Sequence, residues 1–145
     1  MASSAHKIYR GIDPEKKTVS NLKVAGAYLP GTFCSASSTT LTQATTAKQA
    51  LYLLSNREFM GQDIADAYAS GDTAVAFEPW PGDRFMGRFA AATYTYNQEL
   101  TVGASGRLAA AASGDAVIGF YRGSGVALSA GEFDEFIVAN SYAKA

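Results

Sequence analysis

The C-terminal half of the chain reads TAVAFEP (73–79), PWPGD (79–83), RFMGRFAAATYTY (84–96), NQELTVGASG (97–106), RLAAAASGD (107–115), AVIGFYRGSG (116–125) and EFDEFIVAN (132–140). Apolar and polar residues alternate in short runs, and clusters of Gly, Asp, Asn and Ser separate the runs. This pattern is typical of β-strands joined by tight turns. In residues 84–89 it places both arginines and Met86 on one face of a strand, and Phe85 and Phe89 on the other. We therefore expect a mainly β fold, a small sandwich or barrel.

Composition narrows the class of protein. The chain has 145 residues, which is enough for one domain with its own core. Charged residues make up 17% and the net charge is −1, so electrostatics gives no reason to expect nucleic acid or an anionic membrane as the partner. No apolar run reaches the ~18 residues of a membrane span, and the N-terminus lacks the apolar core of a secretory signal. The single cysteine, Cys34, excludes an internal disulfide and favours a reducing compartment.

The N-terminal segment differs from the rest of the chain. Residues 1–22 are polar and mixed in charge, with only a few isolated apolar residues, so we expect an extended arm followed by a single β-rich domain over residues 23–145. Ile8, Tyr9 and Ile12 would allow this arm to attach to a partner.

Between the arm and the β-rich half, the sequence predicts mixed elements. Residues 24–29 favour a short strand, and residues 35–46, rich in Ser and Thr, favour a loop or an irregular edge strand. Residues 47–54 suit either a helix or a buried strand, and the turn-like residues that follow favour the strand. Residues 63–69 are the best helix candidate, with Asp63 as the cap and Gly71 as the stop.

A catalytic centre is not evident in the sequence. The single histidine, His6, lies in the predicted arm, where a general base would lack a fixed setting. One histidine and one cysteine do not make a zinc site, and we expect neither a metal nor another cofactor. Cys34 is expected to be a small packed side chain rather than a nucleophile. Glu132, Asp134 and Glu135 form an acidic group, but the calcium-loop spacing is missing, so a solvated strand face is the favoured interpretation.

Two binding functions remain open from the residues alone. A small β-barrel can bind single-stranded nucleic acid through aromatic and basic side chains. The residues that would build such a groove are Arg84, Arg88, Arg107, Arg122, Phe85, Tyr94, Tyr96 and Tyr121. The acids nearly match the bases in number, which argues against nucleic acid. A glycan-binding adhesin on a virus particle is the other form of this alternative, and a small enzyme that uses carboxylates is a third function.

The order of features resembles that of the capsid decoration (cement, or head-stabilising) proteins of tailed bacteriophages. The resemblance rests on the arm, on LPGTF (29–33), on LYLLSNREFMGQDIADAYASGD (51–72) leading into AVAFEPWPGDRF (74–85), and on RFAAATYTYNQELTVGASGRLAAAASGDAVIGFY (88–121). It covers roughly residues 24–140. The resemblance implies a barrel, jelly-roll or tulip-like body without catalytic residues. It also implies that the protein binds the outside of the capsid, often as a dimer or trimer, and reaches neighbouring subunits with its terminal arm.

This resemblance implies the major capsid protein as partner, with no nucleic acid and no membrane. The expected location is the capsid exterior, after a period in the host cytoplasm. The residues that we expect to contact the partner are Ile8, Tyr9, Ile12, Trp80, Arg84 and Arg88. Trp80 stands between two prolines, where it suits either an exposed anchor for a partner or a plug over the end of a barrel.

Overall fold

The computed structural model describes residue 8 and residues 17–145 and is mainly β, as predicted. The strands are β1 (Thr18–Val19), β2 (Lys23–Val24), β3 (Phe33–Ala36), β4 (Thr40–Gln43), β5 (Leu51–Leu54), β6 (Ala76–Phe77), β7 (Arg84–Arg88), β8 (Ala92–Thr93), β9 (Glu99–Val102), β10 (Leu108–Ala110), β11 (Ala116–Tyr121), β12 (Ala127–Leu128) and β13 (Phe133–Ala143). Two single-turn 3₁₀ helices, η1 (Glu58–Met60) and η2 (Ala104–Gly106), interrupt them. Within the described residues, no helix has the length and apolar character that crossing a membrane requires.

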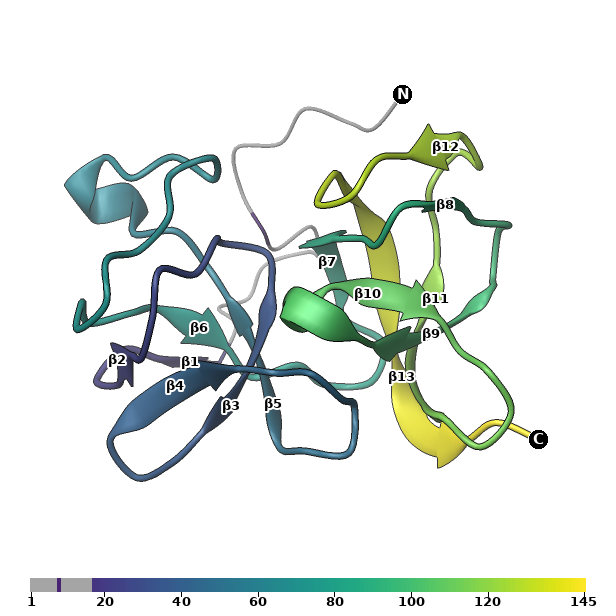
Figure 1. Ribbon diagram of the computed structural model, residues 1–145, viewed down its shortest axis with the longest axis horizontal. Helices are drawn as coiled ribbons and strands as arrows, with labels where there is room; N and C mark the ends of the chain where they lie inside the picture. The colour runs from purple at the N-terminus through teal and green to yellow at the C-terminus, as the bar shows by residue number, and fades with distance from the viewer. Residues whose placement is uncertain (1–7, 9–16) are drawn as a thin grey trace.

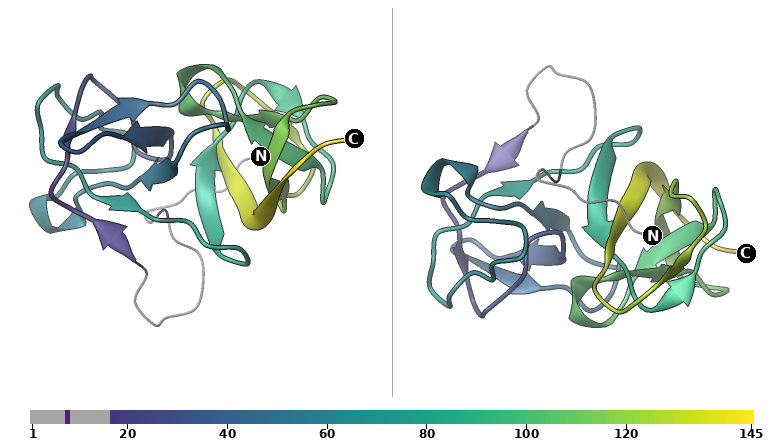
Figure 2. Two further views of the ribbon diagram at one scale, coloured as in Figure 1. Left: turned by 90° about the horizontal axis from the view of Figure 1, so that it is seen from below. Right: turned by 90° about the horizontal axis from the view of Figure 1, so that it is seen from above.

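Two large sheets divide the body into two lobes. The first sheet has the strand order β1-β6-β5-β3-β4-β2 and the second β10-β9-β11-β13-β7, while β12 and β8 form a separate pair. The sheets lie in opposite halves of the long axis (Figure 1), and the two views at right angles show the same separation (Figure 2). We refer to residues 17–78 as the N-terminal lobe and to residues 84–145 as the C-terminal lobe. Residues 79–83 connect them.

A shared apolar core joins the two lobes. Phe33 of β3 and Leu53 of β5 belong to the same buried cluster as Phe85 of β7 and Phe136 of β13. The ring centroids of Phe33 and Phe136 are 5.9 Å apart, within the range of favourable aromatic pairs. The inner faces of the two sheets therefore pack against each other as in a small sandwich, which confirms the predicted fold class.

The predicted helix over residues 63–69 is wrong. The segment forms turns, in which the backbone N–H of Asp63 donates to the carboxylate of Asp66 at 3.1 Å. The N–H of Tyr68 donates to the carbonyl oxygen of Tyr28 at 2.9 Å instead of to the preceding turn. Asp side chains that bond nearby backbone groups compete with a helix, and the long-range bond of Tyr68 decides the outcome. Tyr68 itself is buried in a second cluster within the N-terminal lobe.

The strands of the N-terminal lobe are shorter than the sequence suggests and lie at different positions. Residues 51–54 form β5, so the preference for a strand there is confirmed. Of residues 24–29 only Val24 is in a strand, and residues 35–46 contain the end of β3 and the whole of β4. Residues 17–22, at the end of the predicted arm, lie against the body, because β1 pairs with β6. Short segments of this kind take their structure from their neighbours rather than from their own alternation.

The predicted exposure of one strand face is wrong. In β7, Arg84, Met86 and Arg88 alternate with Phe85 as predicted, and both Phe85 and Met86 are fully buried, so this strand is covered on both faces. Asp134 is buried rather than solvated, and it accepts a hydrogen bond of 2.7 Å from the hydroxyl of Tyr121. The backbone of Gly123 lies so close that a Cβ there would collide with both of these side chains. Asp134, one of the three acids of this group, is thus a structural residue of the core.

Candidate partner-binding surfaces

The predicted anchor Ile8 belongs to the protein's own core. Its side chain is 1% exposed and packs in the cluster that joins the two lobes. The carbonyl oxygen of Ile8 accepts a hydrogen bond of 2.6 Å from the N–H of Met86 in β7, which is the edge strand of its sheet. His6, Tyr9 and Ile12 lie outside the described residues. The Ile8 side chain therefore lies in the core and is not on the surface of this chain.

The two predicted arginines have different surroundings. Arg84 is half exposed, and its Nε lies 4.0 Å from a carboxylate oxygen of Glu135. The guanidinium of Arg88 donates three hydrogen bonds, of 2.7–2.8 Å, to backbone carbonyl oxygens of Pro30, Ile64 and Gly131. It also stacks over the ring of Phe133 at 4.3 Å. Burial, together with the positive charge of Arg107, lowers the pKa of Arg88.

Arg88 consequently fastens the lobes together. Pro30 and Ile64 come from the N-terminal lobe, whereas Gly131 precedes β13 in the C-terminal lobe. A planar guanidinium can satisfy several carbonyls in fixed directions, which a lysine cannot do. No sequence pattern shows this contact, because its partners are 24 to 58 residues away along the chain.

Trp80 is exposed on the surface and does not plug the end of a barrel. Its side chain is 52% exposed at the tip of the connection between the lobes. The turn is tightly held, since the Trp80 N–H donates to the Asp83 carboxylate at 2.9 Å and the Gly82 N–H donates to the Val138 carbonyl at 2.9 Å. A large aromatic side chain on a rigid turn loses little entropy when it binds, and tryptophan is common at the centres of interfaces.

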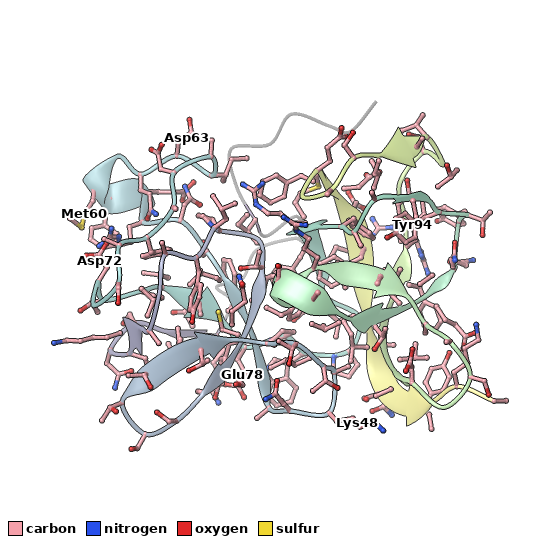
Figure 3. The ribbon with its side chains drawn as sticks, viewed as in Figure 1. Lys48, Met60, Asp63, Asp72, Glu78 and Tyr94 are labelled. Carbon is pink, nitrogen blue, oxygen red and sulfur yellow. The ribbon has the colours of Figure 1, made fainter. Side chains whose placement is uncertain are left out.

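A second exposed apolar site was not predicted from the sequence. Phe59 and Met60 in η1 are 77% and 64% exposed, and we call these two side chains the apolar tip. Figure 3 shows Met60 at the outer end of the N-terminal lobe. The signal in the sequence is an adjacent apolar pair placed between Arg57–Glu58 and Gly61–Gln62, which is unusual for a turn.

The segment around the apolar tip is fixed by polar contacts. The Gln62 side-chain oxygen accepts hydrogen bonds of 2.9 and 3.1 Å from the backbone N–H and the Nε of Arg57. The Asn56 side chain donates to the carbonyl of Gln62 at 2.9 Å. Arg57 also pairs with Asp72 at 3.1 Å. Gly61 ends the turn in the left-handed conformation, with φ of 74°. The apolar tip is therefore presented by an ordered turn.

Two exposed tyrosines lie in the C-terminal lobe. Tyr96 stacks with Arg122, whose guanidinium is 5.2 Å from the ring centroid. Tyr142, near the end of β13, donates a hydrogen bond of 2.6 Å to Glu99. This bond lowers the pKa of Glu99 and raises that of Tyr142. Together with the apolar tip and Trp80, these side chains complete the large exposed hydrophobic residues among the described part of the chain.

The lobes enclose an apolar cleft, which we call the interlobe cleft. Its volume is about 310 Å³. One wall comes from the N-terminal lobe and one from β11 and β13, and the prolines that flank Trp80 also line the cleft. The lining residues are Phe33, Ala47, Gln49, Leu51, Pro79, Pro81, Ile118, Phe136, Val138, Ala139, Asn140 and Ser141. None of these side chains is charged.

The single cysteine of the chain lies in the core. Cys34 is fully buried, and burial raises the pKa of its thiol to about 12, which keeps it protonated and unreactive at neutral pH. This confirms its prediction as a packed side chain. In residue 8 and residues 17–145, His, Cys, Asp and Glu do not gather in groups of three that could hold a metal ion.

The groove suggested for single-stranded nucleic acid does not form from the residues named for it. Phe85, Tyr94 and Tyr121 are each 1% exposed or less, so their rings cannot stack on bases. Of the four aromatic residues, Tyr96 alone is exposed, beside Arg122. What the surface offers instead is a set of separated apolar side chains on a rigid β body.

No protein-family model and no curated protein sequence matches this chain.

Proposed function

We propose that this chain is a non-catalytic structural protein of a bacteriophage particle. In this role it binds the outer surface of the capsid and stabilises the expanded shell by bridging subunits of the major capsid protein. It reaches the capsid exterior from the host cytoplasm and associates with itself as a dimer or trimer.

The observation that carries the proposal is the distribution of the exposed apolar side chains. The apolar tip lies in the N-terminal lobe, Trp80 on the connection between lobes, and Tyr96 and Tyr142 in the C-terminal lobe. A protein that bridges several subunits needs separate contact points on one rigid body. Each further contact then forms within an existing complex and strengthens the whole attachment without a large single interface.

The resemblance in the order of sequence features to capsid decoration proteins supports the same function. The shared core and the Arg88 contacts add a physical argument, because a bridge can transmit load only if its lobes are fastened to each other.

The decisive experiment is to measure the copy number of this chain against the main shell protein in purified particles of the virus that encodes it. We expect a fixed and simple ratio to the shell subunits, which symmetric binding requires. A few copies per particle would point to a tail or adhesion role, and absence from particles would reject the proposal.

A second experiment tests the contact itself. Replacing Trp80 with Ala removes an exposed side chain from a turn whose hydrogen bonds come from the backbone and Asp83. We expect unchanged unfolding but at least tenfold weaker binding to particles stripped of this protein, as is usual for a tryptophan anchor. Thr42→Ala, at an exposed position of β4 in the N-terminal lobe, serves as a comparison. Equal binding by wild type and Trp80→Ala would exclude Trp80 from the contact.

A further inference from the structure

We propose that the apolar tip of one copy docks in the interlobe cleft of a second copy. The tip is a protruding apolar pair and the cleft an apolar hollow, and both belong to the same chain. They cannot fill each other within one molecule. Figure 3 shows Met60 at the outer end of the N-terminal lobe, far from Lys48 at the edge of the cleft.

The two surfaces fit in size and polarity. The cleft, at about 310 Å³, lies at the lower end of the roughly 300–1,000 Å³ typical of pockets that receive a ligand. Such a volume suits a phenyl ring and a thioether side chain together. The lining side chains are uncharged and could not compensate a charged group for its lost hydration. A neutral apolar group therefore has the lowest desolvation cost on entering the cleft. Phe59 and Met60 are the most exposed large apolar side chains of the described residues.

Charges at the edges of the two surfaces are opposite. Glu58 precedes the apolar tip and is exposed, while exposed Lys48 lies between the lining residues Ala47 and Gln49. Within the described part of the chain, neither Glu58 nor Lys48 takes part in an ion pair. Glu78, which precedes the lining residue Pro79, already pairs with Lys17 at 3.3 Å. Docking would therefore allow the Glu58 carboxylate of one copy to form an ion pair with the Lys48 ammonium group of the other.

This contact joins two different surfaces, so it is heterologous. Such contacts repeat head to tail and close into a ring when the rotation between copies allows it. An aromatic side chain buries about 150–250 Å², so Phe59 and Met60 together cover much less than the ~800 Å² per partner of a standard interface. The contact is therefore weak in dilute solution. It becomes effective where copies are held close together, as they would be on a particle. The proposal concerns the free protein and does not require that it binds a capsid.

Cysteine crosslinking between two variants tests the contact in purified protein. One variant carries Met60→Cys on the tip, and a second, of different mass through a short tag, carries Asn140→Cys at the exposed rim of the cleft. Native Cys34 is buried and unreactive, so it contributes no crosslink. The control pairs the Asn140→Cys protein with a Ser124→Cys variant, whose cysteine is exposed but lies outside the tip. On mild oxidation we expect the Met60→Cys protein to form the mixed dimer at least tenfold faster than this control.

Reversing the charge of exposed side chains provides a second measurement. Because these side chains are exposed, the substitutions should not affect folding. Glu58→Lys in the tip partner, or Lys48→Glu in the cleft partner, should each slow the Met60→Cys to Asn140→Cys crosslink about two- to fivefold at low salt. The two changes combined should restore the rate. Because the pair is exposed, the effect should shrink as ionic strength rises.

The outcomes separate this proposal from the alternatives. A mixed dimer no faster than the Ser124→Cys control overturns it. Predominant Met60→Cys to Met60→Cys crosslinks also overturn it, since they mean that two tips pack together. If the charge changes slow crosslinking singly but do not restore it in combination, the tip does not face the Lys48 rim and the proposed geometry is wrong. The copy number on particles is measured independently, so either proposal can fail while the other stands.

Discussion

Replacing Arg88 with Met should show whether this residue fastens the lobes or serves mainly as a partner-binding residue. Met keeps most of the apolar stem and removes the guanidinium, which donates to the carbonyl oxygens of Pro30, Ile64 and Gly131. A hydrogen bond that involves a charged group is worth about 1.5–3 kcal/mol. Three independent bonds would then contribute about 4.5–9 kcal/mol.

The expected loss is smaller than this sum. The three bonds share one group and are not additive, and removal of a half-buried charge also ends its desolvation cost. We therefore expect the free energy of unfolding to fall by about 3–5 kcal/mol. With a urea dependence of ~2 kcal/mol per molar, the unfolding midpoint should drop by roughly 1.5–2.5 M. Arg88→Lys should lose most of the same stability, because an ammonium group cannot match the planar fork.

Urea unfolding followed by tryptophan fluorescence provides the assay, with Arg84→Met as the matched control. Arg84 is half exposed and 4.0 Å from Glu135, so its loss should cost no more than about 1 kcal/mol. A value for Arg88→Met within about 1 kcal/mol of wild type would refute the fastening role. If that stable variant also failed to bind particles, the prediction that Arg88 contacts the partner would be supported instead.

Three further predictions concern buried groups. Ile8→Ala should lower the free energy of unfolding by about 2–5 kcal/mol in thermal or urea denaturation, whereas a side chain on the surface would cost little. Cys34 should react with a thiol reagent only as fast as the protein unfolds, and rapid labelling of the native protein would contradict its burial. Tyr68→Phe should cost about 1–3 kcal/mol, because it removes the 2.5 Å hydrogen bond to the buried carbonyl of Ser55. Burial raises the pKa of Tyr68, so stability should decline as pH rises above about 10, the ordinary tyrosine value, and less steeply in Tyr68→Phe; equal slopes in the two proteins would count against this.

The sequence by itself determined that the chain is mainly β and that Cys34 is a packed side chain. Alternation and turn chemistry identify strands such as β5 and β11, because both signals are local and act within a few residues. The packing of Cys34 follows from the general tendency of a free cysteine to be a small buried side chain. The predicted helix at residues 63–69 failed because a distant backbone group, the carbonyl of Tyr28, accepts the bond that would have continued it.

The tertiary structure decided which residues are available on the surface. Ile8 looked like a free anchor and Asp134 like a solvated acid, yet both are buried against segments far away in sequence. Trp80 was undecided until the fold left it exposed, and the apolar tip gave only a faint signal in the sequence. Exposure depends on where two β lobes meet. Since that meeting is set by contacts between residues distant along the chain, local patterns alone did not decide which of these side chains are exposed.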